Sequence, residues 1–185
     1  MLEIMFKGGP VMVPLLFCSV VSLAIAVERA LFWIDLNARR NPRALNIILR
    51  LAEKDKKVEA LKACKKSKDP VSRILSDGIK NYDHNFKIAL EEGVSREMSN
   101  MNRYMVILDT VITLAPLLGI LGTVTGTIGA FGILGKGGVV DPSGVISGIS
   151  EALISTAAGL IIAIFTVLPY NYYNSMIDAY SREIE

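Results

Sequence analysis

The sequence predicts an all-α integral membrane protein with three transmembrane helices and a small cytoplasmic helical domain. We further expect the second and third helices to extend as long helices into the cytoplasm. Residues 106–134 contain one charged residue, Asp109, and residues 145–170 contain one, Glu151. An apolar stretch of about 18 residues or more is long enough to span a bilayer. The mean hydropathy of +0.43 agrees with this class and excludes a mainly disordered chain.

The first span is the shorter apolar stretch 10–27, from Pro10 to Val27. A cleavable signal peptide is the alternative for this stretch. The stretch is long for the apolar part of a signal peptide, the charges before it are weak, and no small-residue cleavage site follows it. We therefore favour an uncleaved membrane helix, preceded by an N-terminal segment, residues 1–9.

Lysine and arginine set the orientation, because most of the 20 lie in the segment 28–105. The positive-inside rule places this segment in the cytoplasm as a helical domain. The N-terminal segment and the Gly-rich connector 135–144 are then outside. The second and third spans cover 106–134 and 145–170, and residues 171–185 continue the third helix into the cytoplasm.

The cytoplasmic domain is predicted to consist of helices. Asn41–Pro42 and Asp69–Pro70 each combine an N-cap residue with a proline at the first helical position. Apolar residues follow both pairs at helical spacing. A further helix begins near Asn85, and no proline follows before Pro116. We therefore expect one uninterrupted helix from about residue 86 to about residue 134.

Small residues form a stripe along the second span, with spacings that alternate between four and three. Small residues let the backbones of membrane helices approach closely, which supplies the contact that apolar side chains alone do not give in lipid. We expect this stripe to pack against neighbouring helices, in the same chain or in other copies, with one small residue of the third span. The predicted packing residues are Ala115, Gly119, Gly122, Gly126, Gly129 and Gly159.

Polar residues accompany the small ones. Thr123 and Thr127 follow the stripe by one position, and their hydroxyl groups either bond to their own helix or face a water-accessible path. In the third span, Glu151 precedes Ser155 and Thr156. An ionisable residue costs about 2.5–3.5 kcal/mol at the centre of a span and usually faces a bundle interior or a cavity. The alternative for Glu151 is an interfacial position, since it follows the connector closely.

The remaining reactive side chains do not form a recognisable site. Cys18 and Cys64 lie in different surroundings, apolar and Lys-rich, so we expect them to be unpaired. The single histidine, His84, lacks the further ligands that a metal site needs, and Asp109 is expected at the cytoplasmic interface. No phosphate-binding loop, nucleophile elbow or dinucleotide motif occurs. We therefore predict no enzyme, no cofactor, no metal and no nucleic-acid partner.

Two segments resemble a known family. Leu114–Gly126, which reads LAPLLGILGTVTG, and Ser150–Leu160, which reads SEALISTAAGL and is followed by LPYNYY, are similar to the MotA/TolQ/ExbB proton channel family. The ExbB/TolQ branch fits better than the flagellar stator branch, whose members usually have four spans. The resemblance covers roughly residues 105–175. Thr125 departs from the pattern, because relatives often carry a bulky residue there.

The resemblance implies a subunit of a bacterial inner-membrane motor that is driven by the proton-motive force. It implies a homopentamer around a single-span partner resembling ExbD or TolR, which carries a protonatable Asp. Proton flow would then energise a periplasmic protein resembling TonB or TolA, for transport or envelope maintenance. The family's polar pore positions correspond to Thr123, Glu151 and Thr156. Thr127 and Ser155 are secondary pore candidates.

Two other functions stay open from the residues alone. The first is a non-conducting membrane scaffold that assembles and stabilises a partner protein through the glycine stripe. The second is a transporter with its own substrate path, which the sequence favours less because the three spans contain no inverted repeat or pair of broken helices.

Overall fold

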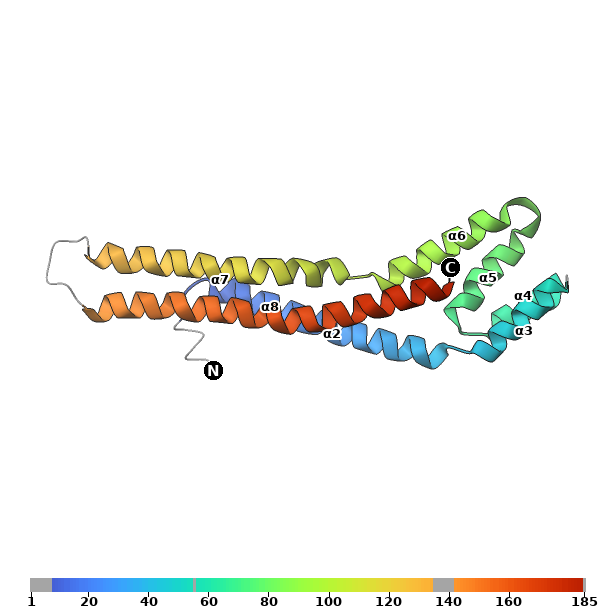
Figure 1. Ribbon diagram of the computed structural model, residues 1–185, viewed down its shortest axis with the longest axis horizontal. Helices are drawn as coiled ribbons and strands as arrows, with labels where there is room; N and C mark the ends of the chain where they lie inside the picture. The colour runs from blue at the N-terminus through green and yellow to red at the C-terminus, as the bar shows by residue number, and fades with distance from the viewer. Residues whose placement is uncertain (1–7, 55, 135–141, 185) are drawn as a thin grey trace. The chain divides into compact units, whose positions relative to one another are not determined.

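The computed structural model describes residues 8–54, 56–134 and 142–184, and the regular structure in these ranges is helical (Figure 1). The predicted all-α class is therefore confirmed. Contacts divide the chain into two units, Met1–Val27 with Tyr104–Tyr172, and Glu28–Arg103 with Tyr173–Glu185. The helices are α2 (Met12–Arg39), α3 (Pro42–Glu53), α4 (Lys57–Lys66), α5 (Pro70–Lys80), α6 (Tyr82–Met101), α7 (Met105–Leu134) and α8 (Pro142–Ile184).

Three segments are long and apolar enough to cross a membrane, namely Met12–Arg39, Asn85–Gly132 and Ser143–Arg182. This finding confirms the three predicted transmembrane helices. The predicted N-terminal segment 1–9 and connector 135–144 fall mostly outside the described residues. The side of the membrane on which each part lies stays a prediction.

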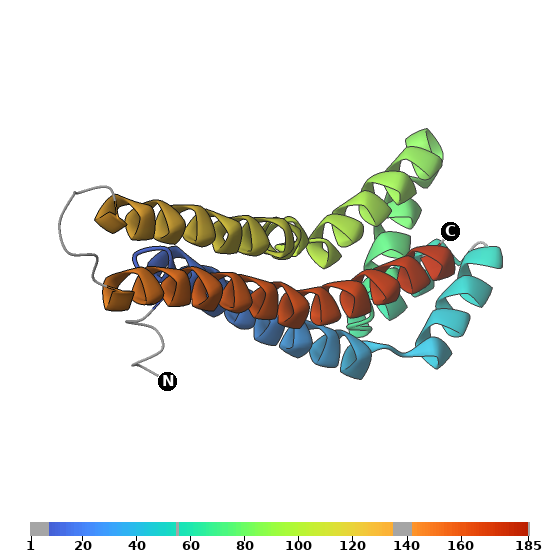
Figure 2. The same cartoon turned by 60° about the vertical axis from the view of Figure 1, so that its left-hand side comes forward.

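In the first unit, α7 and α8 lie side by side and run antiparallel (Figures 1 and 2). Their register follows from the neighbours of two glycines on α7. Gly126 lies against Ala152, and Gly119 lies against Thr156. Residue numbers thus rise along one helix as they fall along the other.

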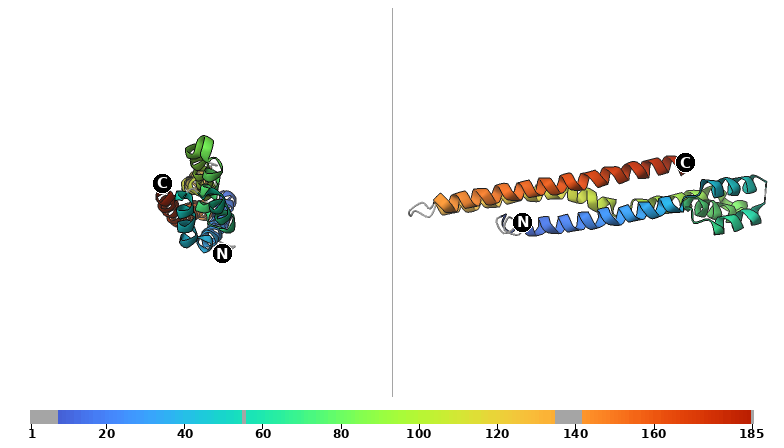
Figure 3. Two further views of the ribbon diagram at one scale, coloured as in Figure 1. Left: turned by 90° about the vertical axis from the view of Figure 1, so that its right-hand side faces the viewer. Right: turned by 90° about the horizontal axis from the view of Figure 1, so that it is seen from below.

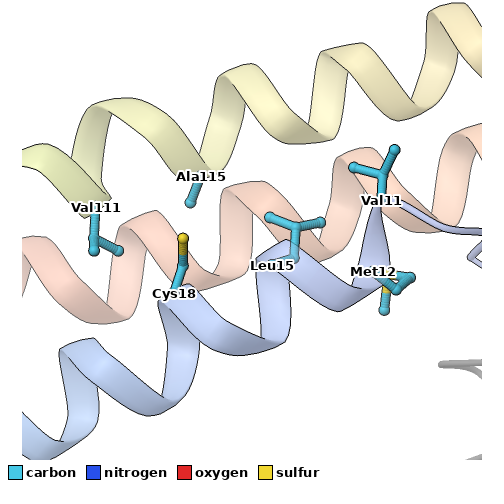
Figure 4. Packing of buried hydrophobic residues seen from close by; sticks show 6 residues of the cluster. All are labelled: Val11, Met12, Leu15, Cys18, Val111 and Ala115. Carbon is cyan, nitrogen blue, oxygen red and sulfur yellow. The ribbon is translucent and has the colours of Figure 1, made fainter.

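The N-terminal part of α2 packs against α7 and α8 through a cluster of buried side chains (Figure 4). Leu118 of α7 and two residues of α8, Ala158 and Ile162, pack against this cluster. In a membrane, such a cluster stabilises the helix bundle by van der Waals packing rather than by removal of apolar surface from water. Its buried members are Val11, Met12, Leu15, Cys18, Val111 and Ala115.

In the second unit, the helices α3 to α6 fold back on one another (Figure 3). The two predicted N-caps are confirmed. The Asn41 side chain accepts a hydrogen bond from the Ala44 amide at 3.1 Å, and the Asp69 carboxylate accepts one from the Val71 amide at 2.9 Å. The second oxygen of Asp69 accepts the Asn41 amide at 2.8 Å, so one carboxylate connects the starts of α3 and α5.

A small apolar core holds these short helices together. Ile48 of α3, Ala60 and Cys64 of α4, and Ile79 of α5 are buried against one another. Cys64 and Cys18 are both buried and unpaired, as the sequence predicts. The side chain of His84 lies outside the described residues.

The prediction of one uninterrupted helix from about residue 86 to about residue 134 is wrong at one point. Helix α6 ends at Met101, α7 begins at Met105, and Tyr104 between them has a φ of 66°, in the left-handed region. The buried guanidinium of Arg29 donates to the carbonyl oxygens of Asn100 at 3.0 Å and of Met101 at 3.4 Å. Carbonyls in the last turn of a helix lack the amide partner four residues on, so this distant arginine adds to the 3.4 Å bond from the Arg103 amide to the Asn100 carbonyl and stabilises the end of α6.

Two smaller differences concern the helices on either side of the break. Helix α6 begins at Tyr82 and contains a non-helical residue at Asn85, where the sequence predicts its start. Helix α8 is continuous from Pro142 to Ile184 and includes Pro169. The helical continuation after the third span is thus present, and its cytoplasmic location stays a prediction.

Candidate functional site

The predicted site residues lie along the line of contact between α7 and α8, which we call the seam. Gly119, Gly122 and Gly126 of α7 and Gly159 of α8 all face the opposite helix. A Cβ atom at Gly159 would collide with the carbonyl oxygen of Ala115, and one at Gly119 would lie 3.0 Å from the Cα of Thr156. Because backbone atoms cannot move aside as side chains do, glycine is required for this close approach.

The glycine stripe does not contact α8 along its whole length. Ala115 is fully buried, and Gly126 would place a Cβ 3.0 Å from the Cβ of Ala152. A Cβ at Gly129 would meet nothing within 4 Å among the described residues. Gly129 is therefore available for a contact that a single described chain does not provide.

Thr156 connects the two helices by a hydrogen bond. Its hydroxyl group donates to the carbonyl oxygen of Gly119 at 2.8 Å, and its side chain is half-buried. The bond is possible because Gly119 has no Cβ atom to hold the backbone of Thr156 away. A group that the sequence presents as a pore candidate thus also fixes the position of α8 against α7.

Thr123 and Thr127 bond within their own helix. The Thr123 hydroxyl donates to the Ile120 carbonyl and the Thr127 hydroxyl to the Thr123 carbonyl, both at 2.6 Å. One of the two alternatives from the sequence, bonding to the helix itself, is therefore present. Both hydroxyl groups act as donors in these bonds, which leaves the two lone pairs of each oxygen as acceptors.

Two further polar residues share this face of α7. At 3.6 residues per turn, Asp109 and Thr113 lie on the same side of the helix as Thr123 and Thr127. Both are exposed in the chain. The sequence predicts Asp109 only at the interface and does not single out Thr113, although both positions fit the spacing of four and three residues that leads to Thr123 and Thr127.

Ser155 is a packing residue of the seam in this chain. It is fully buried, and its hydroxyl group donates to the Ala152 carbonyl at 2.8 Å. A Cβ atom at Gly122 would collide with the Ser155 side chain. The small size of Ser155 is thus matched to the glycine opposite.

Glu151 lies on another side of α8 from Thr156. The step of five positions from one to the other rotates the side chain by about 140° on a regular helix. The Glu151 side chain is half-buried and lies against Gly9, the residue that comes three positions before α2. The described chain therefore does not bring Glu151 and Thr156 into one cluster.

The second unit contains a basic cleft of about 550 Å³ between α4, α5 and α6. Its charges are largely paired: Arg96 and Lys80 lie 3.4 and 3.2 Å from the Asp77 carboxylate, and Arg73 lies 3.9 Å from Glu97. The Arg96–Asp77 and Arg73–Glu97 pairs join α5 to α6, and the Lys80–Asp77 pair lies within α5. Burial raises the pKa of the Cys64 thiol, which also lines the cleft, so this thiol is not activated as a nucleophile. The described residues contain no group of side chains suited to a metal ion.

Known proteins are similar to the part of the chain that contains the seam. A family model described as the MotA/TolQ/ExbB proton channel family matches residues 66–185, a range that includes α7, α8 and every predicted site residue. The ExbB-like biopolymer transport protein 3 of Synechocystis sp. is 36% identical over 174 residues, which cover 91% of this chain and 82% of that protein.

Two further relatives are similar over nearly the whole chain. The ExbB-like biopolymer transport protein 1 of Synechocystis sp. is 37% identical over 183 residues, with 95% of this chain and 71% of that protein covered. A biopolymer transport protein ExbB homolog of Methanothermobacter thermautotrophicus is 32% identical over 187 residues, with 100% and 66% covered.

Proposed function

Because this chain belongs to the MotA/TolQ/ExbB proton channel family, we propose that it is a subunit of a motor driven by the proton-motive force. Copies of the chain form a ring, a homopentamer, around a single-span partner resembling ExbD or TolR. Proton flow energises a periplasmic protein resembling TonB or TolA, for transport or envelope maintenance. Membership of a channel family agrees with the expectation that the chain is not an enzyme.

The observation that carries this proposal is Glu151. It is the only charged residue between positions 145 and 170, and α8 presents it half-buried beside the first span. A carboxyl group at this depth is costly unless it faces protein or water. A role in proton transfer gives a reason for its presence that helix packing does not give.

Threonine hydroxyl groups continue the proposed path. Thr123 and Thr156 lie beside the seam, and Thr127 lies one turn further along α7. Ser155, which is enclosed between the helices, supports the path by packing. Hydroxyl groups both donate and accept hydrogen bonds, so they can hold water or a partner's carboxyl group in line.

Assembly into a ring is supported by small and apolar residues of α7 that are exposed in one chain. Gly129 meets no neighbour among the described residues, and the apolar residues Ile128 and Phe131 close to it are 66% and 65% exposed. Small residues with apolar neighbours are the usual surface for association between membrane helices. In the proposed orientation, the N-terminus is periplasmic and the second unit, with its many cations, is cytoplasmic.

The test is proton flux in proteoliposomes that contain the chain together with its single-span partner. We expect flux under an imposed proton gradient, and its loss in Glu151→Ala, Thr123→Val and Thr156→Val while the complex still assembles. Full activity in all three variants would overturn the proposal. The alternative function, a non-conducting scaffold, predicts instead that these variants are harmless and that only Gly122→Leu, which fills the seam, abolishes assembly.

A further inference from the structure

A short turn before α2 crosses the seam close to Glu151. We call this turn, residues 8–11, the strap. A Cβ atom at Gly8 would lie 3.2 Å from the Ile154 side chain, and one at Gly9 would collide with the Glu151 carboxylate. Further along, Val11 lies 3.7 Å from the Cβ position of Gly122 on α7. The strap therefore touches α8 at two points and α7 at one.

Glycine at position 9 suits both the backbone conformation of the turn and the space that the Glu151 carboxylate occupies. Its φ of 71° lies in the left-handed region, which other residues adopt only at a cost. A side chain there would also occupy the space of the Glu151 carboxylate. No other described glycine of the chain has a positive φ. The conformation of the turn and the position of the carboxylate thus depend on each other.

The strap is held firmly at its C-terminal end. Val11 and Met12 are each 8% exposed, and Leu15 is 1% exposed, all within the cluster that joins α2 to α7. The Met12 amide donates to the Gly9 carbonyl at 3.1 Å, which closes the turn. A turn anchored in this way holds a fixed position rather than swinging freely over α8.

We propose that the strap closes one approach to the Glu151 carboxylate and that Gly9 is a positioning residue for this group. The inference rests on the proposed function, since it deepens the role of Glu151 in the proton path. The strap limits the rotamers open to the Glu151 side chain and shields it from water and reagents on the side of α2. Water and reagents then reach the carboxylate from the side that the strap does not cover.

The first experiment measures how fast a hydrophobic carbodiimide modifies Glu151 in membranes, by mass spectrometry of the peptide that contains it. We expect Gly9→Ala to raise the labelling rate by roughly five- to thirtyfold. Alanine is strained in a left-handed conformation, and this strain shifts the turn toward other conformations by about that factor. The matched control is Gly8→Ala, whose added Cβ would lie 2.5 Å from the Met12 side chain and has no Glu151 atom among its nearest neighbours. It disturbs the strap without entering the space of the carboxylate, so its labelling rate should rise clearly less than that of Gly9→Ala.

The second experiment uses a shorter carboxylate. Glu151→Asp withdraws the carboxylate toward α8 by one methylene, which weakens its clash with a Cβ at position 9. Gly9→Ala should lower proton flux in the Glu151 background and have little further effect in the Asp background, the signature of two residues in contact. If Gly9→Ala does not accumulate, Gly9→Asn replaces it, because asparagine tolerates a positive φ while still adding a side chain.

The outcomes are distinct. Unchanged labelling in Gly9→Ala, or an equal rise in Gly8→Ala, overturns the role of Gly9. An equal loss of flux in both backgrounds overturns it as well. If wild-type proteoliposomes conduct no protons, the proposed function fails, yet the labelling rates still decide whether the strap covers Glu151.

Discussion

Replacing Thr156 by valine separates the two roles that its hydroxyl group combines. Valine has nearly the same shape as threonine but cannot donate the 2.8 Å hydrogen bond to the Gly119 carbonyl. That carbonyl keeps the amide partner that a regular helix gives it. The substitution therefore removes one interhelical hydrogen bond and one polar group beside the seam, with little change in packing.

The cost to stability follows from the type of bond. Hydrogen bonds between membrane helices contribute about 0.6 kcal/mol on average and about 1.7 kcal/mol at most. The unfolding equilibrium of Thr156→Val should therefore shift by about threefold, and by no more than about twentyfold. Thr156→Ser is the matched control, because it keeps the hydroxyl group and loses only a methyl group.

Two assays decide between the roles. Unfolding in detergent measures stability, and proton flux in proteoliposomes with the single-span partner measures conduction. We expect assembly and near-normal stability in Thr156→Val, with flux reduced far beyond the stability loss, and partial or full flux in Thr156→Ser. The result to the contrary would be a loss of proton flux in Thr156→Val no larger than the fold-change in its unfolding equilibrium. The hydroxyl group would then only stabilise the helix contact, which would refute our placement of Thr156 in the path.

Four further outcomes test other parts of the structure. Glu151→Gln should abolish flux while native mass spectrometry shows an unchanged complex; retained flux would contradict its role in the path. Gly122→Leu should disrupt the seam in a thermal unfolding assay, whereas Gly129→Leu should leave the folded chain stable and affect only association between chains. Arg29→Ala should cost about 1.5–3 kcal/mol, since it removes charged hydrogen bonds from a buried guanidinium to the carbonyls at the end of α6, and hydrogen exchange should increase first at the end of α6. Cys64, whose pKa is raised by burial, should resist alkylation at neutral pH until the protein unfolds, because little thiolate is present; rapid labelling of the folded protein would contradict its burial.

The starts of the short helices could be predicted from the sequence because their causes are local. Asn41 and Asp69 each cap the helix that begins at the following proline, and the structure contains both bonds. The end of α6 has a different cause. Its carbonyls are capped by Arg29, which is 71 residues away from Asn100 along the chain. Neither glycine nor proline marks residues 102–104, so the local pattern favoured a continuous helix.

In the candidate site, too, features with local causes could be predicted from the sequence and features with distant causes could not. The spacing of Gly119, Gly122 and Gly126 predicts that they share one face of a helix, and they do lie on one face, against α8. The spacing contains no information about which helix they meet or where along it. The contact between Gly9 and Glu151 joins positions 142 residues apart. It also depends on the positive φ of Gly9, which a single glycine in the sequence does not predict.

The seam has one mechanical consequence. The α8 residues that meet the glycines of α7 are themselves small, at Gly148, Ala152, Ser155 and Gly159. Two surfaces of small residues offer few interlocking side chains that would define how far one helix lies along the other. The directional bond from Thr156 to Gly119 and the α2 cluster, which contacts both helices, therefore help to define the register of α7 against α8.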